Sequence, residues 1–121
     1  MSRTFELGDV IAERQMTFQP RDGEPQEISV RIGRPTQDAS APRETWVCPF
    51  QIAGIGDGET RGIFGADAMQ ALLLAIHTIP AELAAYARDE DGQFLHFGKP
   101  DSSFVSACRT TIEYAGDDFP P

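Results

Sequence analysis

The sequence predicts an α+β fold: an antiparallel sheet of about five to six strands, with one long helical segment, interrupted at Pro80, packed on one face. Two observations indicate this class. Several short runs alternate apolar and polar residues with the period of a half-buried strand, and turn residues separate them. Between residues 67 and 88, apolar residues instead recur at helical spacing. Strands, then one helix, then further strands favour α+β over an alternating α/β arrangement.

The chain has 121 residues, of which 40% are hydrophobic, and this length fits a single domain over residues 1–121. We expect residues 115–121 to form a frayed tail. The longest apolar run, residues 71–76, is much shorter than a membrane span. The first residues lack a basic region followed by an apolar one, so no secretory signal is visible and we expect a cytoplasmic protein.

The first two predicted strands form an antiparallel hairpin. In residues 10–18, Val10, Ala12, Met16 and Phe18 share one face, which Arg14 interrupts. A turn-rich segment centred on residues 22–23 follows. Residues 27–32 then alternate cleanly, and their inward side chains are Ile28, Val30 and Ile32.

Residues 33–43 are polar and contain proline, so we expect a loop and the most mobile connection of the chain. Residues 45–52 form the next predicted strand, with Trp46, Cys48, Phe50 and Ile52 on one face. Pro49 has no N–H for a ladder and therefore predicts an edge position or a bulge. A glycine turn at residues 54–58 leads to a returning strand at residues 60–64.

The helical segment begins with Asp67 as N-cap, and Gln70 completes a capping-box pattern. Its predicted apolar stripe consists of Met69, Leu72, Leu73, Ile76, Leu83 and Tyr86. Pro80 predicts a kink or the start of a second helix. Leu74 lies off the stripe, which fits either deep burial or a homodimer contact.

Residues 89–92 end the helix, and residues 93–97 form the next predicted strand. A turn at residues 98–101 leads to a last predicted strand at residues 103–114.

Charge is the most informative part of the composition. Nineteen acids against ten bases give a net charge of −9. Such a surface repels phosphate backbones and anionic lipids, which disfavours direct binding of nucleic acid or membranes. It attracts a cationic protein partner, although many proteins carry negative charge for solubility alone.

The sequence predicts no cofactor and no metal site. Cys48, Cys108, His77 and His96 are scattered singly, without the short spacings of zinc ligands. We interpret both cysteines as small buried hydrophobic residues. The glycine turn lacks a following Lys-Ser/Thr and a helix, so it does not fit a phosphate loop. The acids at residues 89–91 do not have the spacing of a calcium loop.

Two motifs resemble a known group. Residues 46–54 read W-x-C-P-F-x-I-x-G, and residues 65–72 read G-x-D-x-x-Q-A-L. Together they resemble a family of small, uncharacterised bacterial proteins, a domain of unknown function. The resemblance implies a bacterial origin and no established activity.

Our leading hypothesis is a non-enzymatic, acidic protein that binds another protein. Its sharpest form is an immunity or inhibitor protein that neutralises a cationic bacterial toxin or nuclease. The residues expected to bind the partner are Glu82, Asp89, Glu90, Asp91 and Asp101, with Phe119 added if the tail orders on binding.

Two alternatives stay open. A small-ligand or enzymatic pocket would use Cys48 and His77, together with Arg14 and His96. A homodimeric module would use Leu74 and the helix surface.

Overall fold

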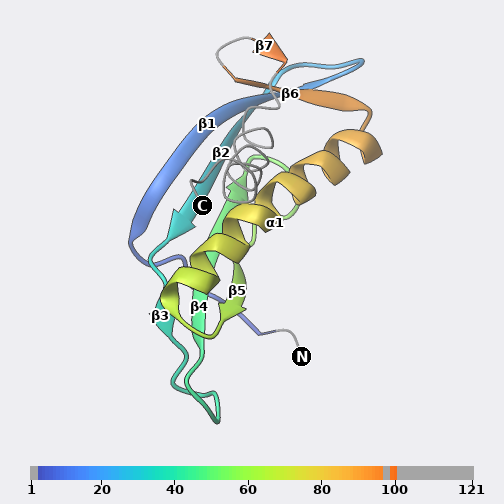
Figure 1. Cartoon of the computed structure of the whole chain (residues 1–121). Coiled ribbons are helices and arrows are strands. Elements are labelled where there is room, and N and C mark those ends of the chain that lie inside the picture. Colours follow the sequence, from blue (N-terminus) through green and yellow to red (C-terminus); the bar gives the residue numbers. More distant parts are fainter. Residues whose placement is uncertain (1–2, 97–98, 101–121) are drawn as a thin grey trace, which may run out of the picture.

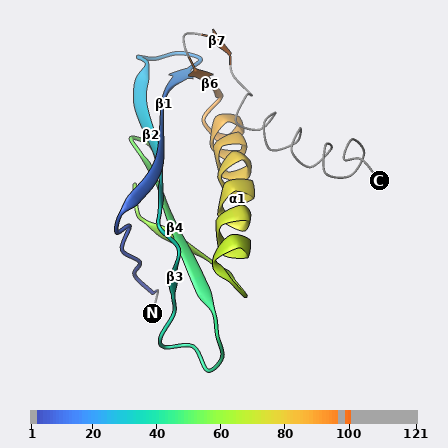
Figure 2. The same ribbon diagram turned by 60° about the vertical axis from the view of Figure 1, so that its left-hand side comes forward.

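Antiparallel pairing organises the described part of the chain, which is residues 3–96 and 99–100 of this computed structural model. The elements are β1 (Val10–Pro20), β2 (Gln26–Gly33), β3 (Thr36–Gln37), β4 (Trp46–Ala53), β5 (Arg61–Gly65), α1 (Ala68–Asp89), β6 (Gly92–His96) and β7 (Lys99–Pro100). They form one sheet in the order β3-β4-β2-β1-β6-β7, and β5 also pairs with β4. Helix α1 lies across one face of this curved sheet, so the α+β prediction is confirmed (Figures 1 and 2). Five of these strands have five residues or more, and β3 and β7 have two each.

The predicted hairpin is confirmed as β1 and β2. Met16 lies opposite Ile28 in the antiparallel register, and both side chains are buried. Val10, however, is 46% exposed and Ala12 is also exposed, so the prediction that both lie inside is wrong. The buried residues of β1 are Met16 and Phe18 in its second half, because the core lies beside that half of the strand.

Strand β4 is internal to the sheet, so an edge position for Pro49 is wrong. Phe50 pairs with β2 through Ile32 and with β5 through Arg61. On the side of β2 and β3, the pairing of β4 is interrupted at Cys48 and Pro49. Between the pairs Ile32–Phe50 and Thr36–Val47, the three residues 33–35 stand opposite the two residues 48–49. This irregularity lets the strand accommodate a proline that cannot donate to the ladder.

Side chains cover both faces of β4. Cys48 and Phe50 lie in the core on the helix side, with Trp46 and Ile52 partly buried beside them as the alternation predicts. On the opposite face, the N-terminal segment, residues 3–9, crosses the sheet. A Cβ on Gly62 would stand 2.4 Å from the Phe5 ring and 2.8 Å from Val47, so glycine is required there. No pattern in the sequence predicts that residues 3–9 pack on this face of the sheet.

The predicted loop at residues 33–43 contains the short strand β3, so that prediction is wrong for residues 36–37. The connection is also tied to the N-terminal segment. The Arg3 guanidinium donates to both carboxylate oxygens of Asp38 at 2.9 and 3.0 Å. Asp38 in turn accepts hydrogen bonds from the backbone N–H and the hydroxyl of Ser40.

Helix α1 begins at the predicted cap. Asp67 Oδ1 accepts from the Gln70 N–H at 2.7 Å. The Gln70 side chain accepts from the Ala66 N–H at 2.6 Å, one residue before its usual capping-box partner. The helix then runs without a break through Pro80 to Asp89, so a second helix after Ile79 is wrong.

The buried side of α1 differs from the predicted stripe. The buried residues are Ala71, Ala75, Ile79, Pro80 and Leu83. Of the predicted stripe, Leu83 is buried and Leu72, Ile76 and Tyr86 are partly buried, whereas Met69 and Leu73 are exposed. The reason is the close approach of the helix to β5. A Cβ on Gly65 would lie 2.4 Å from the Ala71 nitrogen, so only small side chains fit between them.

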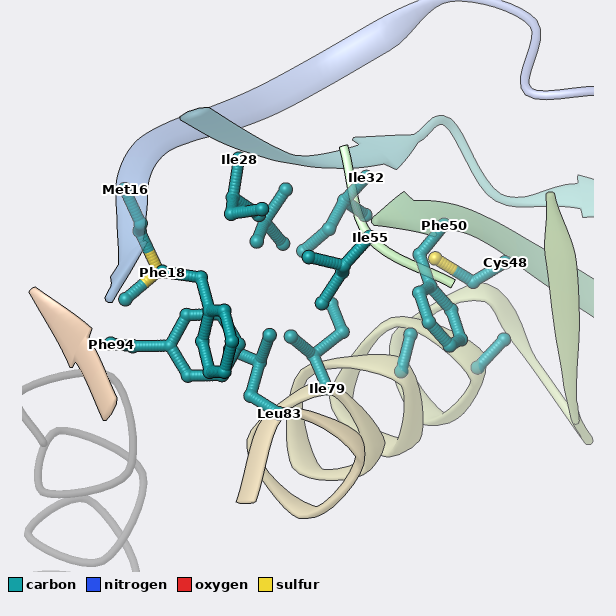
Figure 3. Packing of buried hydrophobic residues seen from close by; sticks show 13 residues of the cluster. Met16, Phe18, Ile28, Ile32, Cys48, Phe50, Ile55, Ile79, Leu83 and Phe94 are labelled. Carbon is teal, nitrogen blue, oxygen red and sulfur yellow. The ribbon is translucent and has the colours of Figure 1, made fainter. Parts of the chain in front are cut away.

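Aromatic rings fill the core near the C-terminal end of α1. The Phe18 and Phe94 rings lie beside each other in the core (Figure 3), with their centroids 4.9 Å apart. The Tyr86 ring centroid lies 5.0 Å from that of Phe18. By length and composition α1 is apolar enough to cross a membrane, with a mean hydropathy of 1.4. Since one side packs against the sheet, we interpret it as the core helix of this domain.

Most of the last predicted elements fall on residues that the structure does not describe. Lys99 and Pro100 pair with β6 as β7, so a turn is wrong for these two residues. The predicted strand at residues 103–114, the tail at 115–121 and the burial of Cys108 lie outside the described residues.

Candidate functional site

A cleft of about 400 Å³ opens between the glycine turn after β4 and the second half of α1. Its lining residues are Phe50, Ile52, Ile55, Gly56, Asp57, Gly58, Glu59, Arg61, Glu82, Ala85, Tyr86 and Asp89. Strand β4 supplies an apolar floor, and the turn and the helix supply two walls that carry charged groups. The cleft therefore combines a hydrophobic base with a charged rim.

The glycine turn is held in place by its backbone conformation and by β4. Gly54, Gly56 and Gly58 all have positive φ, and a Cβ on Gly54 would lie 2.2 Å from the Glu27 carbonyl oxygen. The Gln51 side chain donates to the Gly58 carbonyl at 2.9 Å. Asp57 Oδ1 accepts from the Glu59 N–H at 3.0 Å, which shapes the tip of the turn.

The helical wall follows from residue spacing. Glu82, Tyr86 and Asp89 are four and three residues apart, so successive turns of α1 present them on one side. The Tyr86 ring packs edge-on against Phe18, which fixes the floor of the cleft at this end.

Charge in the cleft is unbalanced. Four carboxylates, those of Asp57, Glu59, Glu82 and Asp89, face one base, Arg61. Arg61 Nη1 lies 2.5 Å from Glu82 Oε1, and this pair is partly exposed. The other three acids keep the rim negative. A long cationic side chain suits such a site, because its aliphatic stem packs on apolar surface while its head meets carboxylates.

The structure brings together two of the five predicted partner-binding residues. Glu82 and Asp89 line the cleft. Glu90 and Asp91 lie at the end of α1 outside it, both exposed, and the Asp91 carboxylate is 3.4 Å from Arg21 in the β1–β2 turn. Asp101, like Phe119, lies outside the described residues.

Sequence reasoning missed three contributors to the cleft: Asp57, Glu59 and Tyr86. The sequence predicts only a turn at residues 54–58, and it places Tyr86 only in an apolar stripe. The sequence did contain a signal: in residues 54–59, Asp57 and Glu59 alternate with glycines, and Ile55 is the only other residue. That turn and the helix meet only in the folded chain.

The residues of the alternative pocket do not line this cleft. Cys48 is fully buried, its thiol faces the Gly33 carbonyl oxygen at 3.6 Å, and burial raises its pKa to about 11. His77 is exposed on α1. Arg14 and His96 are on β1 and β6. A thiol with a raised pKa in the core is a poor nucleophile, which agrees with the expectation of a buried hydrophobic cysteine.

A second cleft, of about 610 Å³, lies between the N-terminal segment and the β2–β4 connection. Its charges are mixed: Arg3 and Arg34 against Glu6, Asp9 and Asp38. The Arg3–Asp38 hydrogen bonds hold the pKa of that carboxyl well below its usual range. We interpret this cleft as the boundary between the N-terminal segment, residues 3–9, and the sheet. Within residues 3–96 and 99–100, no group of three or more His, Cys, Asp and Glu is placed to hold a metal ion.

Comparison with known proteins gives one match. The model of a family described as a domain of unknown function (DUF6968) matches residues 12–105. No curated protein and no solved structure matches the chain.

Proposed function

The chain belongs to the DUF6968 family, and because this membership assigns no activity, we propose from the cleft itself that the protein binds a cationic partner protein. In this proposal the protein acts by binding and not by catalysis, in the cytoplasm. Glu82 and Asp89, with Asp57 and Glu59, receive a lysine or arginine side chain of the partner.

One observation carries the proposal: four carboxylates and one arginine surround an apolar floor. Arg61 is paired with Glu82, and Asp89 has only a long, exposed ion pair with Arg88 at 3.9 Å, so Asp57, Glu59 and Asp89 can meet an incoming cation. The rim acids raise the association rate and the selectivity for a basic partner, and the apolar floor supplies an anchor for affinity.

The whole-chain charge supports the same partner class. A net charge of −9 steers a basic protein toward the surface and disfavours nucleic acid and anionic membranes. The finer form of the proposal is an immunity or inhibitor protein that neutralises a cationic bacterial toxin or nuclease, since nucleases carry basic surfaces for their substrate.

The experiment is a pull-down from the lysate of the source organism at low and high salt, with captured proteins identified by mass spectrometry. The bait is compared with two double variants of equal net charge. Glu59→Gln with Asp89→Asn removes two acids of the cleft, and the Asp89–Arg88 ion pair that this breaks is long, at 3.9 Å, and exposed. Glu24→Gln with Glu44→Gln removes two exposed acids elsewhere.

The proposal expects a basic protein that is captured at low salt, weakened at high salt, lost with the cleft variant and kept with the matched variant. Equal loss with both variants would mean that only overall charge matters and would contradict a site. Recovery of no basic protein at either salt would contradict the partner class.

A further inference from the structure

Strand β5 forms one end of the sheet. Phe50 of β4 pairs with Ile32 of β2 on one side and with Arg61 of β5 on the other, so β4 separates β5 from β2. Among the described residues, β5 pairs with β4 alone. Its outer edge, residues 61–65, therefore presents backbone N–H and C=O groups that no other strand in the described part of the chain meets.

The two ends of the sheet differ in the residues that block edge pairing. At the other end, β7 consists of Lys99 and Pro100. Lysine and proline are residues with which natural sheets prevent a further strand from adding. Strand β5 contains neither, and its one charged residue, Arg61, forms an ion pair with Glu82. Of these two ends, β5 is the one whose sequence permits a further strand.

The residue pattern of β5 is complementary to itself. When a second β5 pairs antiparallel so that all five residues take part, Ile63 lies opposite Ile63 of the second copy. Each Phe64 then lies opposite a Gly62, and each Arg61 lies opposite a Gly65. Phenylalanine and arginine thus face glycine, and no two like charges stand directly opposite each other.

Aromatic rings lie beside this edge on the face of the sheet opposite to α1. Phe64 is 41% exposed, and its ring centroid lies 5.9 Å from that of Phe5. The Phe5 ring covers Gly62, because a Cβ at Gly62 would overlap with it. In the self-paired register, Phe64 of the second copy arrives at Gly62 and packs against this Phe5 ring. The two copies of Phe5 and Phe64 then form one aromatic cluster.

Helix α1 adds apolar surface on the other face of the same edge. It packs along β5, with Glu82 beside Arg61 at one end of the strand and the Ala71 backbone beside Gly65 at the other (Figure 1). Leu74 lies eight residues before Glu82 in the same row of the helix, between these two contacts. Because Leu74 is 42% exposed, a strand added beside β5 finds apolar surface on this face also.

We propose that two copies of this chain associate by antiparallel pairing of β5 with β5, which joins their sheets into one. The occupant of the edge is a second copy because each Phe64 meets a glycine there, and the same strand supplies that glycine. The charge at the edge permits the contact, since Arg61 and Glu82 neutralise each other. The proposal does not rest on the binding of a cationic partner.

The first test is the molar mass in solution, measured by light scattering over about a hundredfold range of protein concentration. Phe64→Lys places a lysine on the edge strand, where it blocks pairing. The matched control is Ile11→Lys, the same charge change at a side chain that is 48% exposed on β1, which is not a neighbour of β5 in the sheet. Both variants lower the net negative charge, so stronger repulsion between copies cannot explain a loss of association. Circular dichroism checks that each variant folds.

We expect the parent and Ile11→Lys to approach twice the monomer mass as the concentration rises. High salt should favour this association, because it screens the repulsion between two chains of charge −9. Phe64→Lys should weaken the association by about tenfold or more. A parent that stays monomeric at every concentration would overturn the proposal, and so would a dimer that Phe64→Lys leaves unchanged.

Hydrogen exchange in the unmodified protein locates the contact. Amides of residues 61–65 that face away from β4 should exchange more slowly at high than at low protein concentration. Residues 26–33 of β2, which has a strand on each side, should exchange at the same rate at both concentrations. Slow exchange at residues 61–65 in a protein that stays monomeric would mean that the chain itself covers this edge, and would overturn the proposal.

Discussion

Arg61 and Glu82 both line the cleft between the glycine turn and α1, and they form an ion pair with 2.5 Å between Nη1 of the guanidinium and Oε1 of the carboxylate. Arg61 comes from β5 and Glu82 from α1, so this pair joins the sheet to the helix. It also supplies the one positive charge among the residues that line the cleft.

Removing that positive charge should strengthen partner binding. Arg61→Gln leaves four carboxylates with no base among the lining residues, so we expect faster association with the captured basic protein and a steeper salt dependence. The stability cost should be below about 1 kcal/mol, because the ion pair is partly exposed. Stopped-flow association and urea unfolding measure the two effects. Arg43→Gln, the same charge change at an exposed position, is the control, and equal acceleration by both variants would argue against a local effect.

The ion pair between Arg3 and Asp38 should make stability depend on pH. Hydrogen bonds from Arg3 and then Ser40 lower the folded-state pKa of Asp38 below its ordinary value of 3.8. The stabilisation is therefore present above pH 3.8 and is lost as the pH falls through the folded-state pKa. Asp38→Asn should lower the thermal midpoint most between about pH 5 and 7, and the gap from the parent should narrow in acid. Asp22→Asn, at an exposed turn position, is the control, and a gap that stays constant down to low pH would refute the linkage.

The buried thiol should be inert in the folded protein. In a Cys108→Ala chain, Cys48 should react with a disulfide reagent at about pH 8 only after urea unfolds the protein, because burial limits access and raises the thiol pKa to about 11. Native-state labelling measures this. Rapid, complete labelling without denaturant would favour the alternative of a ligand or enzymatic pocket at Cys48.

The side of α1 that faces the sheet should contribute strongly to the free energy of unfolding. Ile79 is fully buried, so Ile79→Ala should lower the free energy of unfolding by about 2–5 kcal/mol. Ile11 on β1 is 48% exposed, and Ile11→Ala should cost less than about 1 kcal/mol. Denaturant unfolding of both variants measures the contrast. Similar losses would contradict the placement of the core.

The packing of the N-terminal segment on the sheet should depend on the absence of a side chain at Gly62. Gly62→Ala would place a Cβ 2.4 Å from the Phe5 ring, so we expect residues 5–9 to exchange amide hydrogens faster, as measured by mass spectrometry. Gly23→Ala, whose Cβ would meet only the Pro20 side chain at 3.1 Å, is the control. Unchanged exchange in the Gly62 variant would show that Phe5 does not depend on this contact.

Much of the fold was predictable because its signals are local. Alternation in residues 27–32 and turn residues at 22–23 specify the first hairpin, and the Asp67 cap specifies where α1 begins. The packing of Phe5 against Phe64 and Gly62 of β5 was not predictable, since nothing in the first nine residues indicates which strand they cross. Only half of the candidate site was predictable. Helical spacing relates Glu82 to Asp89, but no periodicity relates either residue to Asp57 or Glu59.

The sequence by itself determined the α+β class, the places of the strands and the helix, the negative charge and the burial of Cys48, because periodicity, capping and composition act over a few residues. The tertiary structure decided which side of α1 faces the sheet and that the glycine turn forms a cleft with Glu82 and Asp89. The physical reason is the close approach of α1 to β5 at Gly65. This contact admits Ala71 and Ala75 and turns Leu73 and Leu74 outward, and no local pattern specifies such a contact between distant segments.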